Sequence, residues 1–511
     1  MIAFSTFTLE VAIPSSREPI THPTRDPERP ATGQRLIPAI LPMPLLTRRH
    51  ILQQAGAGFG GLALQSLLGA DGALTSTNPM AARAPHFAPR AKSVIFLFMY
   101  GGPSHVDLFD PKPELAKWHG KPIPLWKKED SFMVGKTKNV AMQSPYKFAK
   151  HGEAGIDMAE VYPNLSRHAD DLCVIRSMHS ESNNHGPALF QMNTGFMQPG
   201  RPSMGSWVTY GLGSESENLP SFVVLLDKLG APVNGALNWS NGFMPATFQG
   251  VPFRSSGEPI AYLTPPKNVS ASQQRARLDL LKKWNTEYAE ANPTETSLAA
   301  RINTYELAFR MQMSATECTD LSREPESVRK MYGLDHPTTA HFGKNCLLAR
   351  RLVERGVRFV QVYSGGNEGP KAWDAHDDLK RNHDLHCAET DGPIAALLDD
   401  LKMNGLLDTT LVIWGGEFGR SPVAENGKGR DHHPKGFTMW LAGGGIKGGM
   451  IHGATDEFGY AAIEKRVSVP DLHATILHQL GIDHEALTYR FTGRDFRLTD
   501  VSGEVVRELL A

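Results

Sequence analysis

Short runs of apolar residues recur along the chain and alternate with longer amphipathic segments. The first run, residues 92–100, is continuously apolar, which is typical of a strand buried on both faces of a sheet. Similar runs follow at residues 172–175, 221–226, 357–363, 410–414 and 437–441. These six segments are the predicted strands.

Amphipathic stretches lie between several of these strands, at residues 273–291, 297–313, 340–355, 390–404 and 469–480. Buried strands that alternate with helices predict an α/β fold with a mostly parallel, doubly wound sheet flanked by helices, whose ligands bind at the carboxyl ends of the strands. Residues 112–156 and 228–268 break the alternation, and their polar, Pro-rich or Gly-rich sequences predict loop insertions over the strand ends.

Composition narrows the class of protein. The chain is 41% hydrophobic and 21% charged, as expected for a globular protein of this size. Its 53 basic and 54 acidic residues provide no polycationic surface, which argues against a nucleic-acid partner. The four cysteines are scattered and form no CxxC motif, so we expect buried thiols, with one disulfide possible.

The N-terminal region predicts export from the cytoplasm. Residues 47–52 contain Arg48-Arg49 and precede a weakly apolar, Gly/Ala-rich run at 55–68, an order that resembles a twin-arginine signal. This run is too short and too rich in Gly to form a permanent membrane span. We therefore expect a signal peptide at 43–84, preceded at 1–42 by a disordered leader or an incorrectly assigned start. The expected location is the periplasm or cell envelope.

Candidate metal ligands follow two of the predicted strands. Glu417 comes after the strand at 410–414 and a Gly-Gly turn, which would direct its carboxylate away from the core at the sheet's carboxyl edge. Asp374 and His376 follow the strand at 357–363, and their spacing of two places both on one side of an extended segment. For Glu417, the alternative is a plain salt bridge to Arg420.

Two further pairs complete the candidate set. His432 and His433 precede the strand at 437–441, and neighbours in an extended segment point in opposite directions. One of them is therefore expected to bind a metal ion while the other supports it or meets substrate. Asp107 and His105 lie near the end of the first strand, where Asp107 alternatively caps a turn.

The ligand types indicate one or two divalent ions. Carboxylates and imidazoles together suit zinc, manganese or calcium, depending on geometry. His383 and His386 are also candidates by residue type, but their spacing of three favours a solvated helix face instead. Nothing in the pattern indicates an oligomeric state.

Four blocks of sequence resemble the alkaline phosphatase and sulfatase superfamily, and most closely an exported branch of it called domain of unknown function 1501. The blocks lie at residues 101–112, 184–195, 373–376 and 416–420. The likeness implies one α/β domain of this type over residues 90–490, followed by a C-terminal extension at 491–511.

The resemblance also assigns a position to the reacting group. Counted back from Thr194-Gly195, the place of the superfamily's Ser, Thr or modified Cys nucleophile is held by His185. His185 is therefore a candidate nucleophile, metal ligand or general base. Phe418 stands where the superfamily commonly has His or Asn after the acidic ligand, so one metal position lacks a ligand.

Together these features imply a metal-dependent hydrolase of sulfate or phosphate esters, either small molecules or polysaccharides. One metal site would consist of Asp374, His376 and His432 or His433, with Glu417 and Asp107 near a second. Arg420, or alternatively Arg201, would hold the anionic group of the substrate. The alternative function is an envelope binding protein for a glycan or a protein partner, with a degraded catalytic site.

Overall fold

The computed structural model describes residues 80–125, 127, 137–254, 269–291, 305–306, 310, 317–367 and 369–511. The chain divides into two units, Met1–Thr75 and Ser76–Ala511, and the description below concerns the second. The predicted leader, most of the predicted signal peptide and most of the predicted helix at 297–313 lie outside the described residues. Within those residues, no helix combines the length and apolarity that crossing a membrane requires.

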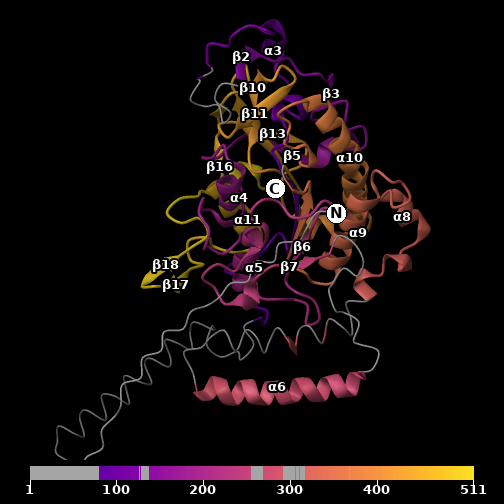
Figure 1. The fold of residues 1–511 in the computed structure, drawn as a ribbon, viewed down its shortest axis with the longest axis vertical. Coiled ribbons are helices and arrows are strands. Elements are labelled where there is room, and N and C mark those ends of the chain that lie inside the picture. Colours follow the sequence, from indigo (N-terminus) through magenta and orange to yellow (C-terminus); the bar gives the residue numbers. More distant parts are fainter. Residues whose placement is uncertain are drawn as a thin grey trace, which may run out of the picture. The chain divides into compact units, whose positions relative to one another are not determined.

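A nine-stranded sheet forms the centre of this unit, in the order β13-β5-β12-β9-β1-β8-β6-β7, with β16 also paired to β5 (Figure 1). Its strands are β1 (Ser93–Met99), β5 (Leu172–His179), β6 (Phe222–Leu225), β7 (Val251–Phe253), β8 (Phe359–Ser364), β9 (Thr410–Gly415), β12 (Phe437–Ala442), β13 (Met450–His452) and β16 (Val467–Ser468). All their pairings are parallel except those of β12, which runs antiparallel to both β5 and β9. The predicted mostly parallel sheet is confirmed.

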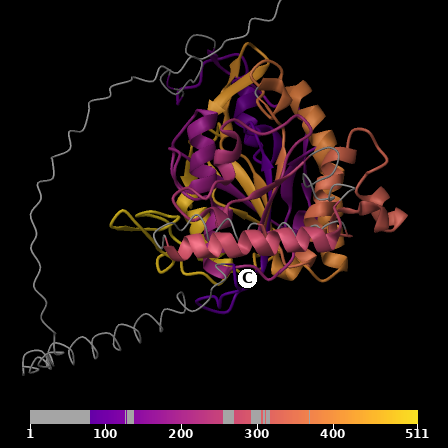
Figure 2. The same ribbon diagram turned by 60° about the horizontal axis from the view of Figure 1, so that its bottom comes forward.

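Helices cover both faces of the sheet (Figure 2). The large helices α9 (Ala340–Glu354) and α10 (Leu379–Met403) pack on one face, and α4 (His185–Thr194), α5 (Met204–Leu212) and α11 (Val469–Gln479) pack on the other. The residues of strand β1 show how one strand contributes to the core on each face. Its alternate residues Ile95, Leu97 and Met99 join the core under α9 and α10, whereas Val94, Phe96 and Phe98 join the opposite core, so a continuously apolar strand satisfies both layers.

Smaller elements surround this framework. The short helices are α2 (His105–Leu108), α3 (Pro113–Lys117) and α8 (Glu326–Met331), and α6 (Ala271–Ala291) corresponds to the helix predicted at 273–291. The remaining strands are β2 (Thr137–Ala141), β3 (Phe148–His151), β4 (Ile156–Ala159), β10 (Gly419–Glu425), β11 (Gly429–His433), β14 (Ala454–Thr455), β15 (Ala462–Glu464), β17 (Tyr489–Phe491) and β18 (Arg494–Phe496).

The reversed direction of β12 is what positions the site. The loops after β1, β5, β8 and β9 leave the sheet at its carboxyl edge. Because β12 runs the other way, the residues that precede it arrive at this same edge. The connection from β9 to β12 is a hairpin, β10 and β11, which the hydrophobic pattern did not predict and which pairs with β2 in a separate three-stranded sheet.

Two predictions about side chains are settled by burial. The prediction of a solvated face for His383 and His386 is wrong, because α10 begins at Leu379 and both rings are buried against Trp373. His383 accepts the Ser104 N–H, and His386 donates to the Ala372 carbonyl. The cysteines are all buried and free, so the possible disulfide is not formed.

Candidate metal centre

Four side chains converge at the carboxyl edge of the sheet. His185 begins α4, Asp374 and His376 lie in the loop after β8, and His432 lies on β11. Asp374 Oδ1 is 3.4 Å from His185 Nε2, 3.0 Å from His376 Nε2 and 3.1 Å from His432 Nε2. The Nε2 atoms of His376 and His432 are 2.9 Å apart. The structure therefore brings together candidates predicted from three separate stretches of sequence.

The other nitrogen of each ring faces an oxygen acceptor. Nδ1 lies 2.6 Å from Glu417 Oε1 in His185, 2.5 Å from Glu425 Oε2 in His376 and 2.7 Å from the Asn183 carbonyl in His432. In the neutral form of each ring, Nδ1 carries the proton and donates it, which leaves a lone pair on Nε2. Nε2 of His185 is buried and makes no hydrogen bond. With neutral rings, three Nε2 lone pairs lie around one carboxylate oxygen, 3.0–3.4 Å from Asp374 Oδ1.

Four contacts among these atoms have the spacing expected between ligands of a transition-metal ion. Zinc binds nitrogen and oxygen ligands at roughly 2.0–2.2 Å, which places neighbouring ligand atoms roughly 3.0–3.5 Å from each other. The three distances from Asp374 Oδ1 to the Nε2 atoms, and the distance between Nε2 of His376 and Nε2 of His432, are 2.9–3.4 Å and fall close to this range. Without a cation or added protons, the converging lone pairs would repel one another, so the donor set fits a bound ion.

Arg420 holds Asp374 in place. Its guanidinium is fully buried, and Nη2 donates to Asp374 Oδ1 at 2.7 Å. Nε donates to the Gly102 carbonyl at 2.9 Å and Nη1 to the Arg430 carbonyl at 3.1 Å. The side chain therefore ties the turn after β1 to the Asp374 loop, and its donors are already engaged by the protein. Arg201 pairs with Asp500 at 3.2 Å.

The electrostatics of the cluster are strongly coupled. Burial opposes ionisation of Asp374, but the Arg420 charge and the three imidazoles hold the pKa of this carboxyl far below its usual range. Burial also lowers the pKa of His376, yet hydrogen bonds with Asp374 and Glu425 outweigh it and raise the pKa to about 9. The pKa of His185 is raised against its burial by Asp374 and Glu417. Burial keeps the pKa of His432 well below its usual range.

Glu417 contacts a ligand candidate instead of forming the alternative salt bridge. Both of its oxygens accept the Gly101 N–H, at 3.1 and 3.3 Å, and Oε1 also accepts from His185. Phe418, the next residue, packs its ring on His185 and His432, with centroids 4.9 and 4.6 Å away. An aromatic wall therefore closes one side of the cluster.

Asp107, His105 and His433 lie outside the cluster. Asp107 is buried in a bidentate ion pair with Arg430, at 2.6 and 3.2 Å. Nε2 of His105 donates to the Gly459 carbonyl at 2.9 Å, and Nε2 of His433 donates to the Tyr460 carbonyl. These three side chains bind neighbouring parts of the protein, so of the adjacent pair only His432 joins the cluster.

The sequence pattern missed two buried carboxylates. Glu425 and Asp431 lie on the β10–β11 hairpin and are 1% and 0% exposed. With His376 they form one group of possible ligand atoms, and His185, Asp374 and His432 form another. Asp431 Oδ1 accepts the His432 N–H at 2.8 Å. Their only signal in the sequence is that they flank the Gly-rich hairpin tip, between Glu417 and His432.

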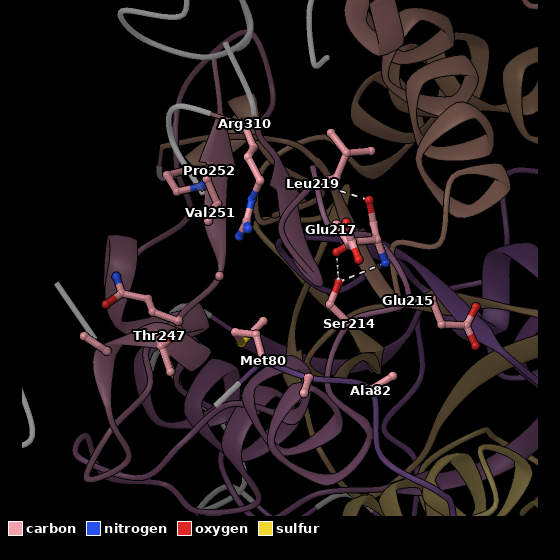
Figure 3. A pocket seen from close by; sticks show the side chains of 15 residues that line it. Met80, Ala82, Ser214, Glu215, Glu217, Leu219, Thr247, Val251, Pro252 and Arg310 are labelled. Atoms are coloured by element: carbon pink, nitrogen blue, oxygen red, sulfur yellow. Dashed lines mark hydrogen bonds between the residues drawn. The ribbon is translucent and has the colours of Figure 1, made fainter. Parts of the chain in front are cut away.

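A cavity lies at another place in this unit. It has a volume of about 880 Å³ and is lined by residues 214–217 before β6 and 249–252 around the start of β7. Figure 3 shows Arg310 extending into it. Since these residues precede strands parallel to β1, the cavity lies toward the amino edge of the sheet, away from the cluster. It does not correspond to the substrate cleft expected over the carboxyl edge.

Comparison with known proteins identifies the family. The model described as "Protein of unknown function (DUF1501)" matches residues 91–510. The chain belongs to the DUF1501 family. A search of curated proteins found no match for this DUF1501 member.

Several solved structures are similar to this DUF1501 protein. The phosphonate monoester hydrolase SpPMH from Silicibacter pomeroyi is 14% identical, with 68% of this chain and 71% of that chain covered and a TM-score of 0.33. The PsFucS1 sulfatase from Pseudoalteromonas sp. is 13% identical, with coverages of 87% and 73% and a TM-score of 0.32. TAB5 alkaline phosphatase, solved with Mg bound, is 9% identical, with coverages of 77% and 99% and a TM-score of 0.32. Likenesses this distant assign no activity to the chain.

Proposed function

We propose that this DUF1501 protein is an exported metal-dependent hydrolase of sulfate or phosphate esters. The ion would be held by Nε2 of His185, His376 and His432 and by Oδ1 of Asp374. The observation that carries the proposal is the convergence of these three nitrogen atoms on one carboxylate oxygen, while each Nδ1 donates to an oxygen acceptor. The blocks of sequence shared with the alkaline phosphatase and sulfatase superfamily support the ester as substrate.

The donor set favours zinc or manganese. Calcium takes six to eight oxygen ligands, whereas imidazole nitrogen suits zinc and other transition metals. Three nitrogens and a single carboxylate oxygen provide too few hard ligands for calcium. Of the three metals that the ligand types suggested, we therefore keep two.

The cluster opens to solvent on one side. His376 is 22% exposed and His185 14%, whereas His432 is only 2% exposed and packs under Phe418. Substrate would therefore approach over His376 and His185. A bound divalent ion would polarise the ester oxygen and lower the pKa of a water molecule. The ligand cluster itself contains no hydroxyl or thiol, so we propose water as the attacking group.

The chain's own residues orient these parts. Glu417 fixes the ring of His185, and Arg420 fixes the carboxylate of Asp374. Phe418 keeps water from the inner side of the cluster. The predicted export signal and loop insertions favour a sulfated or phosphorylated polysaccharide or small molecule of the cell envelope as substrate.

Metal analysis tests the proposal directly. Purified protein is expected to hold a stoichiometric divalent ion, and His432→Ala is expected to lose it because one of four ligands disappears. The matched control is His336→Ala, which removes an exposed histidine outside the cluster and is expected to leave the metal content unchanged. Wild-type protein without a stoichiometric ion after gentle purification would contradict the proposal.

Turnover tests the reaction. Aryl sulfate and aryl phosphate esters, assayed with added zinc or manganese, are expected to release the aryl alcohol with wild-type protein but not with Asp374→Ala. Metal-loaded protein that hydrolyses none of them would favour the binding-protein alternative instead.

A further inference from the structure

Two buried glutamates each form a hydrogen bond with a different histidine of the cluster. Glu417 is 0% exposed and Glu425 is 1% exposed. Glu417 accepts from Nδ1 of His185 at 2.6 Å, and Glu425 accepts from Nδ1 of His376 at 2.5 Å. The two histidines are the more exposed imidazoles of the cluster. Each glutamate therefore bonds to the ring nitrogen opposite the one that lies near Asp374 Oδ1.

The backbone holds Glu417 firmly. It follows β9 after the Gly415-Gly416 turn, and both carboxylate oxygens accept the N–H of Gly101, which follows the neighbouring strand β1. A Cβ on Gly101, which has a φ of +115°, would lie 2.6 Å from the Trp373 and Asp374 nitrogens. The carboxylate is thus fixed between two strand ends and cannot move toward the cluster without losing these contacts.

The hairpin holds Glu425 in the same way. The Arg430 N–H donates to the Ala375 carbonyl and the Leu379 N–H donates to the Lys428 carbonyl, both at 3.0 Å. These bonds attach the end of the hairpin tip and the start of β11 to residues on both sides of His376. Glu425 therefore reaches His376 from a backbone already fixed relative to that ring.

We infer that Glu417 and Glu425 are positioning residues that present two Nε2 atoms to a single ion, and that the centre holds one ion and not two. The inference rests on the proposed metal site. It assigns Glu417 a role other than the predicted ligand, since its carboxylate is bonded to Gly101 and His185. Carboxylates that accept from the far nitrogen of a metal-binding histidine fix its tautomer and strengthen it as a donor.

The close approach of His376, Glu425 and Asp431 also has an explanation that needs no second ion. A further ion among His376, Glu425 and Asp431 would have to compete with the hydrogen bond that Nδ1 of His376 already makes with Glu425. Asp431 meanwhile accepts the His432 N–H. Glu425 and Asp431 thus hold His376 and His432, and Phe418 packs against the rings of His185 and His432.

The test separates a positioning residue from a ligand. Glu417→Gln and Glu425→Gln each keep an oxygen acceptor for Nδ1 but remove the charge. Both variants are expected to hold one ion per chain, with an affinity about 10-fold weaker in chelator competition, whereas Glu417→Ala and Glu425→Ala should weaken it by about 10- to 100-fold. With cobalt in the site, the visible spectrum of the Gln variants should keep the wild-type band positions, because the ligands are unchanged.

Several results would overturn the inference. One is two ions per wild-type chain, and another is a Gln variant that loses its ion as completely as His432→Ala. The inference also fails if the wild type holds one ion and the Ala variants, still folded by circular dichroism, bind it equally well. Wild-type protein that holds no ion at all would instead refute the proposed function. Glu457→Gln, an exposed glutamate, serves as the control for loss of charge.

Discussion

At the scale of single residues, Asp374 is the hub of the centre. One oxygen meets three imidazoles and the Arg420 guanidinium, which is completely buried. A buried guanidinium without its carboxylate is costly, because the charge stays in a low-dielectric environment with no countercharge. In the proposed centre Asp374 would offer a ligand atom, and its carboxylate also neutralises Arg420.

Asp374→Asn separates these functions. In metal-free protein we expect it to lower the free energy of unfolding by about 3 kcal/mol, because Arg420 loses its countercharge. The measurement is chemical denaturation in the presence of a chelator. The exposed neighbour Asp377→Asn is the matched control and should stay within about 0.5 kcal/mol of wild type. Equal stability of the two variants would show that the ion pair has no net role.

At this scale, local sequence was enough to find Asp374, His376 and His432. Each lies next to a strongly apolar strand, and side chains at strand ends must gather at the sheet's edge. Local sequence could not show that His105 and His433 lie outside the cluster, because they are also histidines near strand ends. Their rings bond to the carbonyls of Gly459 and Tyr460, and no local pattern reports such a distant partner.

At the scale of elements, the β10–β11 hairpin packs closely against the loop after β8. It supplies His432 as a ligand candidate and Glu425 as the support of His376. Gly429 is the point of closest approach, since a Cβ there would lie 1.7 Å from the His376 carbonyl oxygen. The hairpin can reach the loop only because this position has no side chain.

Gly429→Ala is expected to push the loop away and displace His376. Metal affinity should fall at least about tenfold, because a ligand shifted by a fraction of an ångström no longer meets the other three. Gly427→Ala at the tip is the control, since a Cβ there meets nothing within 4 Å and adds only the strain of a φ of +84°. Chelator competition with both variants checks the prediction. Equal affinities would mean that the close contact is unimportant for the centre.

The hairpin also shows the limit of pattern reading for elements. The six predicted strands all formed, because burial on both faces leaves a continuous apolar signature. The strands β10 and β11 carry Arg, Asp, Glu and His in fully buried positions, so their composition resembles a loop. Their charged groups are buried because they pair with distant residues, as Arg420 does with Asp374 and Arg430 with Asp107, and such pairing depends on tertiary contacts.

At the scale of the whole molecule, buried neutral histidines make the fold sensitive to acid. His473 on α11 is fully buried, donates to the Met192 carbonyl, and has its pKa lowered to about 4 by burial. In the unfolded chain the ring takes up a proton near pH 6.5. The unfolded state therefore binds more protons between pH 6.5 and 4, and the free energy of unfolding falls as the pH drops through this range.

His473→Gln keeps a donor for the Met192 carbonyl but cannot take up a proton. Between pH 6.5 and 5, its loss of stability should be smaller than that of wild type by about 2 kcal/mol. Urea unfolding at both pH values provides the measurement, with the exposed His336→Gln as the control. An unchanged acid response would show that His473 does not contribute to it.

The connection between β9 and β12 supplies residues of the candidate centre, although the sheet itself does not require a connection of this length. These two strands are adjacent and antiparallel, with Trp414 opposite Trp440, and a tight turn of a few residues is enough to join such a pair. The chain instead places residues 416–436 between them, and Glu417, Phe418, Arg420, Glu425 and His432 all come from this one insert. A DUF1501 relative with a short turn here would keep the same sheet and lack the centre. The length of this connection would then distinguish, from sequence alone, the members of the family able to hold an ion from those that retain only the scaffold.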